Sequence, residues 1–183
     1  MKNWLKTYWW IPTLIIGGGI LTWAYFYFRN PKNKIAFGFS SPNDLGNLLP
    51  VIEGRYASRG TDKGIGIYLD VPLTTLVKNK GARELTLDNI AGSLSYEGES
   101  IFQTKADSKA LQNVKVAGKA QRPVTDTFQI LINGKTIKYI KEFVAGNKPK
   151  LNYNLTAMVL GDVYSFKDSV ILNESTPNNT MGK

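Results

Sequence analysis

The hydrophobic and polar positions follow two different patterns along this chain. Residues 9–28 form an uncharged apolar run, whereas the chain from Ile35 onward alternates apolar and polar positions. An unbroken run of this length, 20 residues, makes a helix about 30 Å long, which matches the hydrocarbon core of a bilayer. Alternation with a period of two is typical of strands that bury one face. The pattern therefore predicts one transmembrane helix followed by a β-rich domain.

Aromatic and basic residues flank the apolar run at both ends, as is common at membrane interfaces. The membrane-interface residues predicted in this way are Trp4, Tyr8, Trp9, Trp10, Trp23, Tyr25, Tyr27, Arg29, Lys32 and Lys34. The run ends in bulky residues, with only Ala24 small, which argues against a cleaved signal peptide. Positive groups are balanced across the run, so we expect a single-pass membrane protein whose orientation is undetermined. Gly17, Gly18 and Gly19 lie mid-span, where small residues permit helix association.

Several short alternating runs after residue 34 predict strands. Their apolar positions are Ile35, Phe37, Phe39; Ile65, Ile67, Leu69, Val71; Leu85, Leu87; Leu94, Tyr96, Ile101; Leu111, Val114, Val116; Val124, Phe128, Ile130 and Ile132. Asn133 and Gly134 separate two such runs and favour the positive φ angles of a type I′ turn, which predicts a β-hairpin over residues 128–140. A final strand pair is predicted over residues 151–160 and 163–172, with a turn at Gly161-Asp162. Residues 41–64 predict mainly loop, with one helical turn near 44–49.

Short strands with regular turns favour an all-β fold, an antiparallel β-sandwich of about seven or eight strands preceded by one transmembrane helix. The predicted organisation is a polar tail over residues 1–8, the membrane helix over 9–28 and a juxtamembrane linker over 29–34. The sandwich domain then covers residues 35–173, and residues 174–183 form a flexible tail that lacks a core-forming pattern.

Residues 77–101, VKNKGARELTLDNIAGSLSYEGESI, carry a combination of residues that points to a family. Its elements are an Asn that ends a strand, paired apolar residues, a Leu-x-Tyr strand and a Gly, here Asn79, Leu85, Leu87, Ile90, Leu94, Tyr96 and Gly98. In this the chain resembles late-embryogenesis-abundant type 2 domains, also called water-stress and hypersensitive-response domains, although Lys80 stands where that family usually has Pro. The resemblance extends loosely over residues 65–172. It implies an anchored sandwich without catalytic residues, linked to stress tolerance, membrane surfaces or apolar ligands.

Residue types that commonly carry catalysis are missing from this chain. It has no Cys and no His, which excludes thiol nucleophiles, Ser-His-Asp triads and thiolate or imidazole metal ligands. Glu97 and Glu99 lie two residues apart and could pair for acid/base work or hold a cation, but the sequence YEGES around them is typical of a solvated turn. We therefore expect a protein that is not an enzyme, with no catalytic residues, cofactor or metal.

The net charge of +9 raises the question of nucleic acid. Five of the 23 basic residues flank the apolar run, so the rest of the chain carries 18 of them against 14 acidic residues, without a cluster in the sequence. A mild positive charge beside a membrane is better explained by anionic headgroups, so no nucleic acid is expected. The partners predicted are the lipid bilayer and other proteins or copies of this chain, and an apolar ligand fits between the sheets.

Two functions remain open from the sequence. The first is a non-catalytic, membrane-anchored binding or scaffolding module at a membrane surface. The second is a minor structural membrane protein of a larger assembly, such as a membrane-containing virion or a cell-surface machine.

Overall fold

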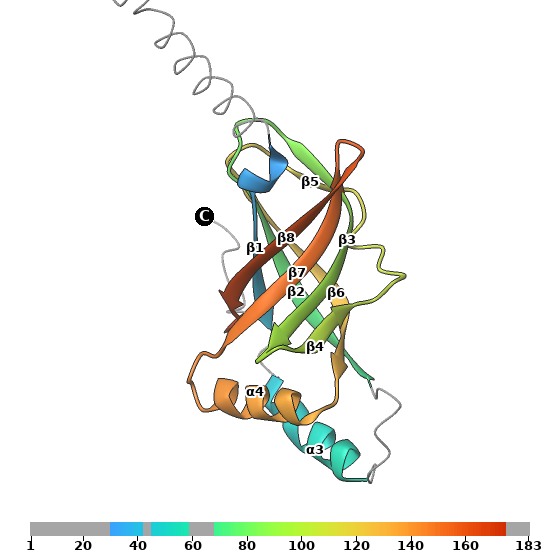
Figure 1. The fold of residues 1–183 in the computed structure, drawn as a ribbon, viewed down its shortest axis with the longest axis vertical. Helices are drawn as coiled ribbons and strands as arrows, with labels where there is room; N and C mark the ends of the chain where they lie inside the picture. The colour runs from blue at the N-terminus through green and yellow to red at the C-terminus, as the bar shows by residue number, and fades with distance from the viewer. Residues whose placement is uncertain (1–29, 42–44, 59–67, 175–183) are drawn as a thin grey trace, which may run out of the picture.

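The computed structural model of the chain describes residues 30–41, 45–58 and 68–174 (Figure 1). Within these residues, nine strands form one sheet in the order β8-β7-β3-β4-β6-β2-β1-β9, with β5 paired to β3. The strands are β1 (Ile35–Ser41), β2 (Tyr68–Asn79), β3 (Leu85–Tyr96), β4 (Glu99–Thr104), β5 (Val114–Val116), β6 (Gln121–Leu131), β7 (Lys150–Val159), β8 (Asp162–Ile171) and β9 (Asn173–Glu174). The helices are η1 (Pro31–Asn33), η2 (Leu45–Leu48), α3 (Leu49–Ala57) and α4 (Gly134–Val144).

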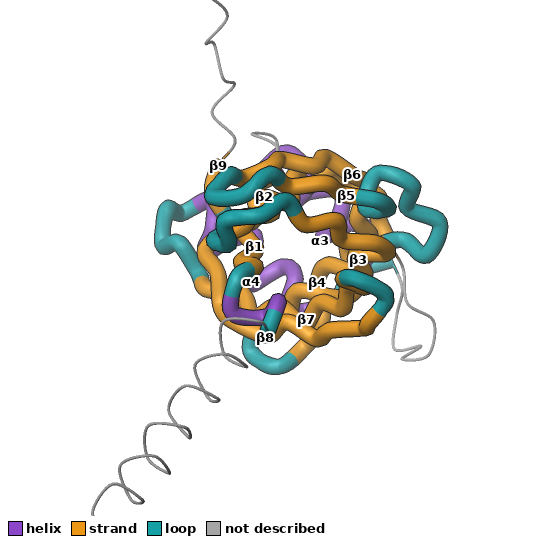
Figure 2. The backbone as a smooth tube through the Cα atoms, turned by 90° about the horizontal axis from the view of Figure 1, so that it is seen from above, coloured by secondary structure: helices purple, strands orange, loops and turns teal. Residues whose placement is uncertain are grey.

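The sheet curls around on itself and nearly closes, as the view along its axis shows (Figure 2). The only parallel pair that the structure describes joins β1 to the short β9, which follows directly on β8. Aromatic side chains also connect β1 to the β7–β8 pair. The ring centroid of Phe37 on β1 lies 5.3 Å from that of Phe166 on β8 and 6.0 Å from that of Tyr153 on β7. The result is one wall of strands around one core.

The core follows directly from the alternation in the sequence. Every second residue of β1 and of β7 is buried, because successive side chains of a strand point to opposite faces. Phe39 and Phe128 meet edge to face inside the sheet, with ring centroids 6.5 Å apart. Aromatic rings thus form part of the core inside the sheet.

The predicted all-β, mostly antiparallel fold is confirmed. In place of the two sheets of the predicted sandwich, the structure has one continuous sheet that nearly closes on itself. The final strand pair is also confirmed as β7 and β8, with the turn one residue earlier than predicted, at Leu160-Gly161. The helical turn expected near residues 44–49 continues as α3 to Ala57.

The predicted hairpin at Asn133-Gly134 is wrong. Asn133 has an extended backbone, with φ of −144° and ψ of 175°, and is the N-cap of α4, which begins at Gly134. Its side-chain oxygen accepts a hydrogen bond from the backbone N–H of Thr136 at 2.8 Å. The buried positions Thr136, Tyr139 and Ile140 are spaced by three and one, which suits one face of a helix. A short apolar run fits the period of a strand as well as that of a helix, so the pattern alone does not distinguish them. The N-cap at Asn133 stabilises the helix.

The helices η2, α3 and α4 gather at one end of the sheet, which we call the helical end together with the β3–β4 turn (Figure 1). The chain enters the sheet at the opposite end. There Asn30 caps η1, in which Pro31 is buried, so residues 30–34 of the predicted linker 29–34 belong to the folded domain.

No helix among the described residues is long and apolar enough to cross a membrane. The predicted span 9–28, Gly17–Gly19 and the interface residues from Trp4 to Arg29 lie outside the described part of the chain.

Candidate functional site: the basic end of the sheet

The side chain of Asn79, the last residue of β2, organises the end at which the chain enters the sheet. It is 1% exposed, and its amide nitrogen donates to the carbonyl oxygens of Arg83 at 2.7 Å and Val116 at 3.0 Å. Its side-chain oxygen accepts from the backbone N–H of Gly81 at 2.8 Å. Because a buried amide must be paired, this one residue fixes the loop 80–84 against β5.

Backbone hydrogen bonds tie further segments to the same loop. The N–H of Lys80 donates to the carbonyl of Lys34 at 2.6 Å, and the N–H of Lys119 donates to the carbonyl of Gly81 at 2.8 Å. Gly118 lies so close to this loop that an added Cβ would be 2.1 Å from the carbonyl oxygen of Ala82. Segments far apart in the sequence, around residues 34, 80 and 118, therefore form one rigid surface.

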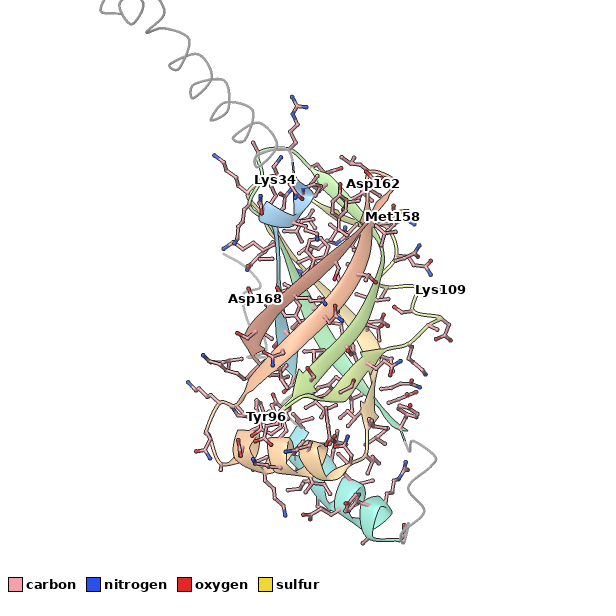
Figure 3. The ribbon with its side chains drawn as sticks, in the orientation of Figure 1. Lys34, Tyr96, Lys109, Met158, Asp162 and Asp168 are labelled. Atoms are coloured by element: carbon pink, nitrogen blue, oxygen red, sulfur yellow. The ribbon has the colours of Figure 1, made fainter. Side chains whose placement is uncertain are left out.

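Basic side chains gather on this surface. They come from η1, the end of β2, the loop 80–84, β5, the turn 117–120 and the start of β6. We call this the basic end, and its eight basic residues are Lys32, Lys34, Lys78, Lys80, Arg83, Lys115, Lys119 and Arg122. Only Lys34 is half-buried; the others are exposed. Acidic residues at this end are Glu84, Asp88 and Asp162, so positive charge prevails; Figure 3 shows Lys34 and Asp162 here.

None of these eight cations forms an ion pair among the residues that the structure describes. The guanidinium of Arg122 donates to the carbonyl oxygen of Lys115 at 3.0 Å, which is a neutral partner. Like charges on neighbouring loops repel one another, and the acidic residues described at this end are fewer than the cations. The arrangement is suited to an external surface that is negatively charged.

The lysines of α4 at the helical end, in contrast, are ion-paired. Lys135 and Lys138 of α4 both pair with Glu97, and Lys141 pairs with Glu53 at 2.7 Å. Hydrogen bonds from Lys135 and then Lys138 lower the pKa of Glu97 to about 2. A carboxyl held ionised in this way cannot serve as an acid at neutral pH, so the Glu97 and Glu99 turn is a solvated, ion-paired turn.

Burial and hydrogen bonding shape the tyrosines beneath α4. The hydroxyl of Tyr96 donates to Glu142 at 2.8 Å, and this bond is the largest cause of a raised Tyr96 pKa. Tyr139 is fully buried, and burial raises its pKa as well. Both hydroxyls therefore stay protonated at neutral pH; that of Tyr96 is hydrogen-bonded, whereas that of Tyr139 is buried without a hydrogen-bond partner among the described residues.

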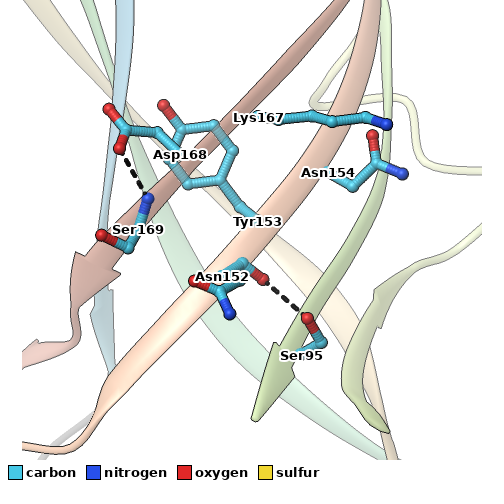
Figure 4. A pocket seen from close by; sticks show the side chains of 7 residues that line it. All are labelled: Ser95, Asn152, Tyr153, Asn154, Lys167, Asp168 and Ser169. Atoms are coloured by element: carbon cyan, nitrogen blue, oxygen red, sulfur yellow. Dashed lines mark hydrogen bonds between the residues drawn. The ribbon is translucent and has the colours of Figure 1, made fainter. Parts of the chain in front are cut away.

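A shallow open hollow of about 540 Å³ lies across β3, β7 and β8 (Figure 4). It is lined mostly by short polar side chains and one lysine, namely Ser95, Asn152, Tyr153, Asn154, Lys167, Asp168 and Ser169. It contains no pair of groups arranged as nucleophile and base. Among the described residues, no three His, Cys, Asp or Glu side chains form a group that could hold a metal ion.

The structure brings together residues that the sequence analysis left scattered. Lys32 and Lys34, predicted as membrane-interface residues, do lie at the basic end, but the other six basic residues there were not singled out. The sequence did carry a signal for these six residues, because they lie at or beside predicted strand ends and turns. Which ends meet in space depends on strand order, which the sequence pattern does not specify.

Comparison with known proteins does not reveal a family. No family model and no curated protein matches this chain. Solved structures that match this chain in part are a protein from Archaeoglobus fulgidus (9% identity, 62% of this chain and 98% of that one, TM-score 0.33) and a FixG-related protein from Vibrio parahaemolyticus (9%, 78% and 97%, TM-score 0.31). A family 123 glycoside hydrolase from Clostridium perfringens is similar over 77% of this chain and 28% of its own, at 10% identity and a TM-score of 0.25. With TM-scores this low, these likenesses carry no functional argument.

Proposed function

We propose that this chain is a non-catalytic, membrane-anchored binding or scaffolding module that holds its basic end against an anionic bilayer surface. The observation that carries this proposal is the gathering of eight cations, none ion-paired within the described part of the chain, at the end where the chain enters the sheet. Each Lys or Arg close to an anionic leaflet contributes about 1 kcal/mol of attraction, so several together orient a domain.

The order of segments along the chain supports the same orientation. The apolar run 9–28 ends immediately before Arg29 and Asn30, and Asn30 leads into η1 at the basic end. If residues 9–28 span the bilayer, the folded structure begins within two residues of the span, which leaves no long linker. The basic end then faces the headgroups and the helical end points away, where it is free to meet a partner.

The first test measures the distance of each end from the lipid. The chain has no Cys, so a single introduced Cys is a unique labelling site. The full-length chain is reconstituted in nanodiscs that contain phosphatidylserine and acceptor-labelled lipid, with a donor on A82C at the basic end or on E99C at the helical end. β2 alone, with 12 residues, spans about 40 Å, so energy transfer should be much stronger from A82C than from E99C.

A charge reversal tests whether the basic end sets this orientation. The variant K80E/R83E/K119E, in the A82C background, is expected to lose transfer, because repulsion from phosphatidylserine tilts the domain. The matched control R55E/K148E/K150E changes the same number of exposed basic residues near the helical end and should leave transfer unchanged. Equal transfer from both ends, or extraction of the full chain by alkaline carbonate, would overturn the proposal.

A structural subunit of a larger assembly remains the second candidate, because α3 and α4 expose apolar side chains at the helical end. Val51, Tyr56 and Val144 are 45%, 49% and 57% exposed. Such residues suit a protein neighbour. A subunit would purify from its native membrane in fixed stoichiometry with the same neighbour, whereas a regulatory binding module would not.

A further inference from the structure

The turn between β7 and β8 exposes two apolar side chains to solvent. Leu160 is 83% exposed and Val163 is 74% exposed, and these are the highest values among the large hydrophobic residues that the structure describes. Val163 lies opposite Met158 across the strand pair, and Asp162 lies opposite Val159, so Val163 and Asp162 point to different faces of the hairpin. Val163 and Met158 are therefore neighbours on one face of this tip, with Asp88 of β3 opposite Met158 on the same face.

The backbone at the tip is in a conformation that does not suit leucine. Leu160 has φ of 56° and Gly161 has φ of 90°, the left-handed angles of a tight two-residue hairpin. Asn or Gly takes the first of these positions without strain, whereas the Cβ of other residues crowds the neighbouring carbonyl oxygen. Because the side chain of Leu160 is exposed, packing within the domain does not offset this cost. Lys119 and Lys148 also have positive φ with exposed side chains, but Leu160 combines such an angle with an exposed apolar side chain, and this combination points to a contact outside the fold.

The tip lies at the basic end. Val159, next to the turn, is opposite Leu87 on β3, and the preceding part of β3 pairs with β5, which carries Lys115. Figure 3 shows Met158 and Asp162 at the same end of the molecule as Lys34. An apolar tip beside a cationic surface is the combination that binds the boundary between headgroups and acyl chains.

We propose that the β7–β8 tip inserts Leu160 and Val163 into the surface of an anionic lipid bilayer, as a membrane contact separate from the apolar run 9–28. The inference rests on the proposed function for the direction in which the basic end faces. Leu160 is then retained for its apolar side chain in spite of its backbone angle. The cations supply attraction to the headgroups, and the tip fixes how the domain stands on the membrane.

The experiment places a nitroxide on V163C in the full-length chain, in nanodiscs that contain phosphatidylserine. The matched control is E99C at the helical end. Collision of the spin label with oxygen, which partitions into lipid, and with a nickel chelate, which stays in water, reports its depth. We expect V163C to be accessible to oxygen and shielded from nickel, and E99C to show the reverse. With phosphatidylcholine alone, the shielding of V163C should decrease.

A second variant separates membrane contact from folding. L160N relaxes the turn, so its melting temperature should stay equal to or exceed that of the parent. The V163C label should nevertheless move toward water in L160N, because half of the apolar tip is gone. A less stable L160N whose label stays in lipid would overturn the inference.

The outcomes distinguish this inference from the proposed function. A V163C label as accessible to nickel as E99C overturns the tip insertion, whether or not carbonate extracts the chain. A label in lipid on a chain that carbonate does extract supports the tip and overturns the anchor. A label shielded from both oxygen and nickel indicates a protein neighbour and also overturns the insertion.

Discussion

The two ends of this sheet differ in how their charges are paired. At the helical end, the three lysines of α4 form ion pairs with Glu97, Glu142 and Glu53, whereas Arg55, Lys148 and Lys150 form none among the described residues. At the basic end, eight cations share a surface with three acidic residues, and none of the eight is ion-paired among the described residues. Both ends lie on the same continuous sheet, so the fold as such does not require this difference.

The comparison separates charges that serve the fold from charges that are available to a partner. Exposed ion pairs stabilise a protein only slightly, but they do neutralise the surface on which they lie. The basic end instead keeps its loops rigid through a buried neutral amide, Asn79, and leaves its charges uncompensated. Electrostatic binding to a membrane is favoured when the charges of a surface are unpaired and its loops are already ordered. Binding then costs little further conformational entropy.

The largest expected effect is the loss of the amide that orders the basic end. Asn79→Ala leaves the carbonyls of Arg83 and Val116 and the N–H of Gly81 without their partner. We expect the free energy of unfolding to fall by about 2–4 kcal/mol. Denaturant unfolding measures this loss, and amide exchange should rise in residues 80–84. Asn152→Ala, at an exposed position of β7, is the matched control, and an equal effect of both variants would contradict the role of Asn79.

An intermediate effect is expected from the N-cap at the helical end. Asn133→Ala removes the acceptor for the backbone N–H of Thr136, which should lower the free energy of unfolding by about 1 kcal/mol. Thermal or denaturant unfolding measures it, with Asn147→Ala just beyond α4 as the control. If residues 128–140 formed the hairpin that the sequence suggests, Asn133→Ala would instead disrupt strand pairing, and circular dichroism would show no loss of helix.

The smallest effect is expected from the ion pairs themselves. The pKa of Glu97 is lowered from 4.5 to about 2 by Lys135 and Lys138, so its contribution to stability is present above about pH 4.5 and disappears as the pH falls through about 2. Glu97→Gln should therefore be slightly less stable than the parent at neutral pH and equal to it in strong acid. Carboxyl titration by NMR checks the pKa, and Glu99→Gln should leave the pH dependence unchanged. An ordinary pKa at Glu97 would show that the pairing is not formed in solution.

Strands could be predicted from sequence wherever one face is buried along the whole run. β1 and β7 have such runs, with Ile35, Phe37 and Phe39 in the first and Leu151 to Val159 in the second, and both were predicted close to their actual bounds. Alternation fails as a guide at Asn133, since the run after it satisfies a helical period as well. The hydrogen bond from the Thr136 backbone N–H to the Asn133 side chain is the local feature that favours the helix over the strand. In the sequence, this cap is visible as an Asn three residues before a Thr.

The sequence by itself determined that the described domain is mostly antiparallel β and where most of its strands lie, because burial of alternate side chains leaves a period-two pattern in the residues themselves. It also placed the apolar run 9–28 directly before the domain. Only the tertiary structure decided that one sheet curls around the core and that residues near 34, 80, 118 and 160 meet at one end. Strand order and register arise from packing among distant segments, so charges that are scattered along the chain become a surface only when those segments meet.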